Sequence, residues 1–191
     1  MKPKANPIAA AVSQFLMKAA LPLGAYFIAE YMVSVLATGN VLLAMLRLAM
    51  AAATPVALFF MLRTLRDRIL GGYIRGRHAW LYGVQAMIFA ALIEAAFIYT
   101  YNEFLVPDNL AQMQQAALAQ FDASRAALES MPAGGSASVV EAMGGLVEEM
   151  RHAPVPTAIE AAVSQLSNDF MVGMVLMLAV APMVRRHKAQ G

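Results

Sequence analysis

Four long apolar stretches, each with a single charged residue, constrain this chain more than any other feature of its sequence. A helix needs about 20 mainly apolar residues to cross the roughly 30 Å hydrocarbon core of a bilayer. Three stretches reach this length directly, and the fourth reaches it when Asp169 is included; they cover residues 19–37, 41–62, 79–101 and 163–184. We therefore predict an all-α polytopic membrane protein, with a four-transmembrane-helix bundle forming a single membrane domain over residues 1–191.

The composition argues against a soluble domain. Hydrophobic residues make up 60% of the chain and charged residues 14%, whereas soluble domains have about 45–50% apolar and about 25% charged residues. The basic residues that give a net charge of +2 lie beside apolar segments and form no separate basic domain, so we expect no nucleic acid partner. The absence of cysteine excludes disulfides, thiolate metal ligands and cysteine nucleophiles.

The basic residues predict the orientation of the helices. They flank the first helix (Lys2, Lys4, Lys18), connect the second to the third (Arg63, Arg66, Arg68, Arg75, Arg77) and follow the fourth (Arg185, Arg186, Lys188). Four crossings put all three groups on one side, which the positive-inside rule identifies as the cytoplasm. Both termini are then cytoplasmic, and the arginines of the connecting loop are expected to contact anionic head groups and to fix the topology.

A cleaved signal peptide is the alternative interpretation of the first apolar stretch. Pro22 and Glu30 interrupt the stretch, and no clear small-x-small cleavage site precedes Asn40. We expect this helix to be retained.

Residues 102–157 form the opposite loop, with seven acidic residues against two arginines. Asp108 resembles a helix N-cap, and apolar residues recur at helical spacing from Leu110 to Leu128. Residues 132–136 (PAGGS) predict a break, and 138–151 a second amphipathic helix. We predict a helical extracytoplasmic excursion between the third and fourth spans, whose helices pack on each other, on the membrane surface or on a partner.

The four charged residues inside the spans are expected to lie at one level. A rise of about 1.5 Å per residue puts Glu30 roughly 12 Å, and Arg47 and Glu94 about 10 Å, below the outer face. Asp169 falls in the same half of its helix. We predict a polar layer facing the bundle interior, with Glu30 and Arg47 as direct partners and with contributions from the side chains of Tyr26, Ser34, Thr54, Gln165 and Asn168.

This layer has two interpretations. Charged side chains at bilayer depth cost about 2.5–3.5 kcal/mol each on insertion scales, so they need partners or water. In the first interpretation the charges neutralise one another and lock helix register. In the second, Glu94 or Asp169 lines a pocket that binds a cation, a proton or a polar head group, because three acids outnumber one arginine.

No motif predicts catalysis, a cofactor or a metal. The glycines of residues 71–76 (GGYIRG) fit no nucleotide-binding spacing, and we assign them to loop flexibility. His78, His152 and His187 have no second ligand at metal-site spacing. We expect no catalytic residues, no cofactor-binding residues and no metal site, and the chain is not expected to be an enzyme.

Residues 71–113 join a basic glycine-containing loop to an aromatic-ended helix and then to Pro107, Asp108 and Leu110. With Tyr99 and Tyr101, this pattern resembles a bacterial family of four-helix membrane proteins known as domain of unknown function 4199. Asn109 departs from the aromatic residue usual in that family. The resemblance implies a protein of the bacterial cytoplasmic (inner) membrane with no assigned activity.

Two functions follow as hypotheses. The first is a non-enzymatic scaffold or complex subunit that uses its extracytoplasmic helices for interaction. Its partners would be membrane lipids and another protein or a second copy of the chain, bound through residues 108–151. The second is a small transporter or channel-like protein that uses the acidic layer.

Overall fold

The computed structural model describes residues 7–37, 40–129 and 137–185 and contains the expected four helices long and apolar enough to span a membrane. They are α1 (Pro7–Leu36), α2 (Val41–Arg68), α3 (Gly76–Thr100) and α6 (Ala158–Val184). A short π-helical segment, Tyr101–Leu105, prolongs α3. The prediction of an all-α membrane bundle is confirmed, and the helices extend beyond the apolar stretches because helical hydrogen bonding continues past the hydrocarbon core.

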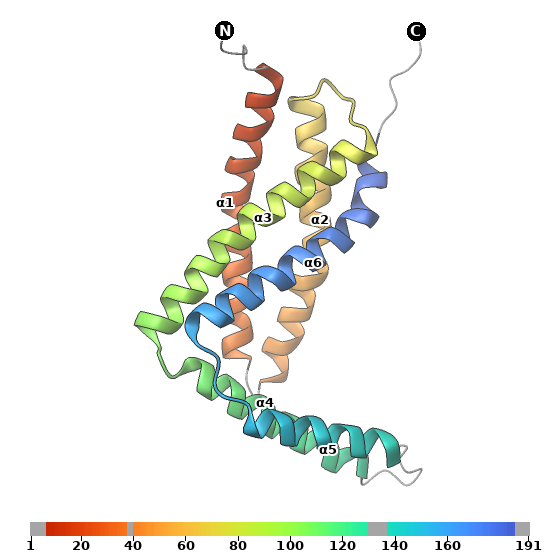
Figure 1. The fold of residues 1–191 in the computed structure, drawn as a ribbon. Helices are drawn as coiled ribbons and strands as arrows, with labels where there is room; N and C mark the ends of the chain where they lie inside the picture. The colour runs from red at the N-terminus through yellow and green to blue at the C-terminus, as the bar shows by residue number, and fades with distance from the viewer. Residues whose placement is uncertain (1–6, 38–39, 130–136, 186–191) are drawn as a thin grey trace.

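The four spanning helices are arranged around α3, which is the most buried of them, while α2 is the least buried. Figure 1 shows α3 and α6 running side by side across α1 and α2. The beginning of α1, the α2–α3 connection and the end of α6 lie at one end of the bundle, which we call the loop end. The other end carries α4 and α5, and we call it the hairpin end (Figure 1).

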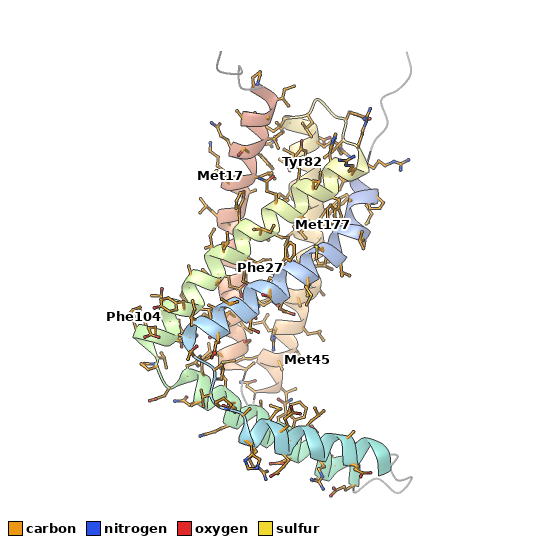
Figure 2. The ribbon with its side chains drawn as sticks, viewed as in Figure 1. Met17, Phe27, Met45, Tyr82, Phe104 and Met177 are labelled. Atoms are coloured by element: carbon orange, nitrogen blue, oxygen red, sulfur yellow. The ribbon has the colours of Figure 1, made fainter. Side chains whose placement is uncertain are left out.

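The outer surface of the bundle is apolar, as a lipid-facing surface requires. Met17, Met45 and Phe104 point away from the helices (Figure 2), and each is at least 60% exposed. Burial inside the bundle instead favours small residues. Ala79, Ala86 and Ala90 of α3 are fully buried, which lets the neighbouring helices approach closely.

Two glycine–methionine contacts fix the register of α3 against α6. A Cβ at Gly83 would lie 2.3 Å from Cε and from Sδ of Met177, and a Cβ at Gly173 would lie 3.0 Å from Cε of Met87. The two contacts are spaced by the same four residues on each antiparallel helix, so they belong to one register. Each methionine fills the space that the opposite glycine leaves.

The helices α4 (Asn109–Glu129) and α5 (Ala137–His152) form a hairpin of their own. Gln114 donates hydrogen bonds to the carbonyls of Met150 (3.1 Å) and Ala153 (3.0 Å), and Arg151 pairs with Asp122 at 3.3 Å. Their bounds agree closely with the sequence prediction. The break expected at 132–136 lies outside the described residues.

Local signals set several helix ends. The Asn40 side chain accepts hydrogen bonds from the N–H groups of Leu42 (3.0 Å) and Leu43 (3.3 Å), so it caps α2. Its φ of −115° is the extended conformation usual for an N-cap residue; Thr38 and Gly39 lie outside the described residues. Gly71 and Gly72 have φ values of 66° and 85°, a left-handed backbone conformation that favours glycine. The tight connection between α2 and α3 therefore explains this pair better than the flexibility we expected.

Candidate functional site

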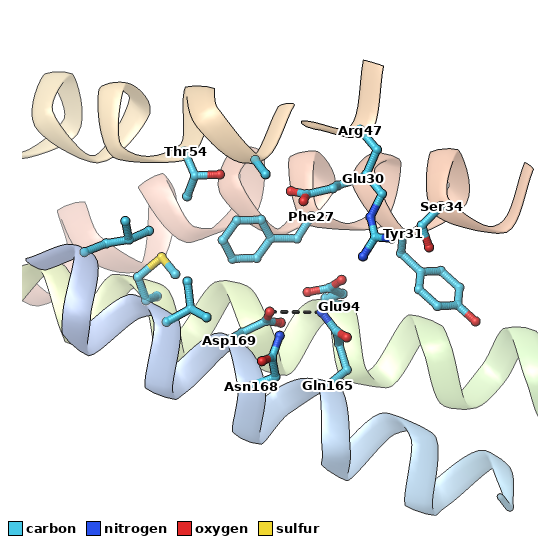
Figure 3. A pocket seen from close by; sticks show the side chains of 14 residues that line it. Phe27, Glu30, Tyr31, Ser34, Arg47, Thr54, Glu94, Gln165, Asn168 and Asp169 are labelled. Carbon is cyan, nitrogen blue, oxygen red and sulfur yellow. Dashed lines mark hydrogen bonds between the residues drawn. The ribbon is translucent and has the colours of Figure 1, made fainter. Parts of the chain in front are cut away.

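One cavity inside the bundle is lined by all four predicted intramembrane charges, Glu30, Arg47, Glu94 and Asp169. It has a volume of about 250 Å³, and α1, α2, α3 and α6 each contribute to its wall. A space of this size is large enough to hold several water molecules. Figure 3 shows the polar side chains converging on it from the four helices.

Helical periodicity explains how distant residues reach this cavity. The lining positions of each helix recur at the i, i+3, i+4, i+7 spacing of one face of an α-helix. On α1 they are Phe27, Glu30, Tyr31 and Ser34; on α2 Arg47, Ala51 and Thr54; on α3 Met87 and Glu94; and on α6 Gln165, Asn168, Asp169, Val172 and Leu176.

Glu94 forms the deepest part of the site. It continues the buried stripe of α3 that includes Met87, Ala90 and Ala91, and it is itself 3% exposed. Its Oε2 atom has no hydrogen-bond partner. A carboxyl group at a core position of a membrane helix needs a hydrogen-bond partner or a compensating charge, and no described N–H or hydroxyl group supplies one to this oxygen.

Asp169 lies next to Glu94 across the α3–α6 interface. The glycine–methionine register puts Glu94 level with Leu166, between Gln165 and Asp169. Gln165 donates a 2.9 Å hydrogen bond to Oδ1 of Asp169 (Figure 3), whereas the Oδ2 atom of Asp169 is buried without a partner. The two carboxyl groups are close enough to interact. When one of them carries a proton it can donate to the other, but no described N–H or hydroxyl group donates to Glu94 Oε2 or to Asp169 Oδ2.

Arg47 and Glu30 lie on the opposite wall. Arg47 is exposed, and Figure 3 shows its guanidinium group extending into the cavity. Arg47 and Glu30 interact electrostatically as expected of partners, but no salt bridge joins them among the described residues. The two residues instead contribute separately to one cavity, with Arg47 and the exposed Asn168 at its accessible side.

Four of the five other polar residues predicted for the layer line the cavity, and one does not. Ser34, Thr54, Gln165 and Asn168 line the cavity as expected. Tyr26 does not, because it faces α2 and donates its hydroxyl hydrogen to the Met50 carbonyl. It contributes instead to a second, apolar pocket between α1 and α2.

Tyr31 is a site residue that the sequence reasoning missed. Its ring lines the cavity, and its hydroxyl accepts hydrogen bonds from the amides of Asn102 (2.9 Å) and Asn109 (3.3 Å). Asn109 also donates to the Asn102 carbonyl oxygen at 2.8 Å, and both asparagines are buried. Helical periodicity could have identified it, since Tyr31 lies on the same face of α1 as Phe27, Glu30 and Ser34.

The predicted topology-determining arginines have different environments. Arg66 is 5% exposed and donates to the Val184 carbonyl (2.9 Å) and to Asp67 (2.8 and 3.1 Å), so it joins α2 to α6 at the loop end. Four of the five are exposed: Arg63, Arg68, Arg75 and Arg77. Of the whole set only Arg75 lies between the helices, where it donates a 3.1 Å hydrogen bond to the Tyr73 hydroxyl.

The acids are not arranged as a metal centre. Within residues 7–37, 40–129 and 137–185, no group of three His, Asp or Glu side chains is placed to hold a metal ion. What the cavity offers instead is hydrogen-bond acceptance at Glu94 and Asp169, and a guanidinium donor at Arg47.

Comparison with known proteins gives one match. The model of a family described as "Protein of unknown function (DUF4199)" matches residues 17–186. Searches of curated proteins and of solved structures found no match.

Proposed function

Since this chain belongs to the DUF4199 family, whose description assigns no activity, we propose a function from the cavity itself: the protein binds a small cationic ligand inside the membrane, as a small transporter or channel-like protein. No catalytic step is part of this proposal.

One observation carries the proposal. Glu94 is 3% exposed, at a core position of the central helix, and no described N–H or hydroxyl group donates to its Oε2 atom or to the buried Oδ2 atom of Asp169, so through these oxygens the two carboxyls can hydrogen-bond only to each other. Charges that served only to hold helices together would be expected to form ion pairs, yet no salt bridge joins either acid to a basic residue that the structure describes. A cationic ligand supplies the missing donor or positive charge and offsets the excess of three acids over one arginine.

Thermal unfolding of the purified protein tests this proposal. A ligand that binds only the folded state at a concentration of about 100 Kd stabilises it by roughly 2.7 kcal/mol. We expect small ammonium compounds such as ethanolamine to raise the Tm of the wild type and to have no effect on Glu94→Gln. Glu103→Gln is the matched control, because Glu103 is an exposed acid that does not line the cavity.

An unchanged Tm of the wild type across the ammonium panel would contradict the proposal. So would equal shifts in the wild type and in Glu94→Gln. Ethanolamine uptake into liposomes containing the wild type, lost in Glu94→Gln, would support transport over binding alone.

We further propose that the membrane is the cytoplasmic membrane of a bacterium, with the loop end in the cytoplasm and the hairpin end outside. Support comes from the four exposed arginines of residues 63–77 and from the excess of acids in residues 102–157. The chain has no native cysteine, so single cysteines can be labelled cleanly. We expect an impermeant thiol reagent to label Glu129→Cys in intact cells and Arg68→Cys only after permeabilisation; labelling of both in intact cells would refute this orientation.

A scaffold role remains the second candidate, and the hairpin supports it. The helices α4 and α5 contact each other more than they contact the spanning helices, and Phe121 (38%) and Leu146 (54%) leave apolar surface exposed. Phe121→Ser with Leu146→Ser should release any hairpin partner without unfolding the bundle. Crosslinking in native membranes with an unchanged set of products in this variant would exclude a partner on this surface.

A further inference from the structure

Resting on the proposed function, we propose that the ligand is a zwitterion that combines a primary ammonium with an anionic group. Glu94 and Asp169 accept hydrogen bonds from the ammonium at the deep side of the cavity, and Arg47 binds the anionic group at its exposed side. Both halves of this assignment follow from charged groups that form no salt bridge with another described residue.

The deep side selects the ammonium. Glu94 Oε2 and Asp169 Oδ2 are buried and adjacent, and no described N–H or hydroxyl group donates to them, so through these oxygens the two carboxyls can hydrogen-bond only to each other. Glu94 is more than nine-tenths buried. A primary ammonium carries three N–H donors and can bond to both oxygens at once. A quaternary ammonium has no N–H group, and the described acids form no metal-binding group. A primary ammonium therefore fits the site better than a quaternary ammonium or a metal ion.

The exposed side selects the anion. The Arg47 guanidinium extends into the cavity, and no hydrogen bond or salt bridge joins it to another described side chain (Figure 3). Glu30 lies on the same wall and interacts with Arg47 electrostatically, but forms no salt bridge with it. A guanidinium group binds phosphate or carboxylate through two parallel hydrogen bonds. A purely cationic ligand would leave this group unused and would be repelled by it.

The polar part of the ligand must be small. The cavity holds about 250 Å³, and Arg47 and Asn168, which flank its accessible side, come from the two neighbouring helices α2 and α6. The shared chemistry, an ammonium a few bonds from a phosphate or carboxylate, occurs both in a phospholipid head group and in free zwitterions. The experiment separates these two sources.

Binding of four soluble probes to the purified wild type tests the proposal by calorimetry. They are glycerophosphoethanolamine (zwitterion), ethanolamine (cation), glycerol phosphate (anion) and glycerophosphocholine (zwitterion without N–H donors). We expect glycerophosphoethanolamine to bind about tenfold or more tightly than each of the others, as expected for an added hydrogen-bonded charge pair. Equal affinity for glycerophosphoethanolamine and ethanolamine would overturn the zwitterion while leaving cation binding intact; binding of none would overturn both.

Variants test separately the residues proposed to bind the anionic group and the ammonium. Arg47→Gln should remove the advantage of glycerophosphoethanolamine over ethanolamine, and Glu94→Gln should weaken both probes. Arg68→Gln is the matched control, because Arg68 is an exposed arginine at the loop end that does not line the cavity. An unchanged probe ratio in Arg47→Gln overturns the role of Arg47. The comparison among probes needs only the wild type, so it stands even if a variant does not fold.

Nanodiscs then identify the source. If the ligand is a lipid, phosphatidylethanolamine discs should weaken the binding of glycerophosphoethanolamine relative to phosphatidylcholine discs, because the lipid competes for the cavity. Equal binding in the two kinds of disc assigns the site to a free zwitterion. Stronger competition by phosphatidylcholine would overturn the proposal, since its head group has no N–H donor.

Discussion

Replacing Gly83 by alanine gives the sharpest test of the packing that positions the acidic site. The new Cβ would lie 2.3 Å from both Cε and Sδ of Met177 and 3.1 Å from its Cγ, and Met177 is fully buried. Overpacking of this kind costs about 1–3 kcal/mol, while alanine in place of glycine in a helix returns about 1 kcal/mol. We therefore expect Gly83→Ala to lower the free energy of unfolding by up to about 2 kcal/mol.

Met177→Ala removes all three of the crowded atoms, at a cost of about 2–5 kcal/mol for the cavity it leaves. In that background Gly83→Ala has no clash with Met177 and should instead stabilise by about 1 kcal/mol. The double-mutant cycle thus predicts a coupling energy of about 1–3 kcal/mol, and the helix-propensity contribution cancels.

Unfolding in mixed detergent–SDS micelles, followed by far-UV circular dichroism, measures each free energy. Gly145→Ala is the control for propensity alone, since no heavy atom lies within 4 Å of a Cβ there. If the Gly83 and Met177 effects add to within about 0.5 kcal/mol, the close contact does not exist. Because the same register brings Glu94 to Asp169, Gly83→Ala should also weaken ammonium binding, and the double variant should recover part of it.

Further changes can be measured by the same titration. Arg66→Gln should destabilise the protein by about 1–3 kcal/mol because it removes a buried charged hydrogen bond to Val184 and a part-buried one to Asp67. Arg63→Gln loses one exposed ion pair with Asp67 and should change the stability by no more than about 1 kcal/mol. Similar effects of the two variants would contradict the link between α2 and α6 at the loop end. Asn102→Ala should cost about 1–3 kcal/mol, since it leaves Asn109 and Tyr31 without their buried partner. Thr157→Ala should cost about 0.5–2 kcal/mol through loss of the N-cap of α6, and no loss in either variant would refute these roles.

The spanning helices and the four intramembrane charges were predictable because both depend on local composition. An apolar stretch must cross the bilayer, and a charge within it is visible by its position alone. The beginning of α6 was predictable too, since Thr157 and Glu160 form a capping box at the spacing known for this motif. Hydrophobicity alone placed the start of the span at residue 163, because the first turns of α6 are less apolar.

Other features depend on contacts that no local pattern encodes. The burial of Arg66 requires the carbonyl of Val184, which lies 118 residues later in the chain. The Tyr31–Asn102 hydrogen bond spans 71 residues, and the glycine–methionine contacts require two helices in one register. That no salt bridge joins Glu30 and Arg47 among the described residues has a related reason, because a helical hairpin fixes the depth of two side chains but leaves the rotation of each helix undetermined.

Tyr31 gives the protein a mechanical connection between its interior and its exterior. The ring borders the space where a ligand would sit, and the hydroxyl holds Asn102 and Asn109, the latter at the first position of α4. A ligand that displaces the ring therefore weakens the hydrogen bonds of Tyr31 to Asn102 and Asn109. A partner that displaces the hairpin in turn changes the volume available to the ligand. By thermodynamic reciprocity the two effects are equal in free energy.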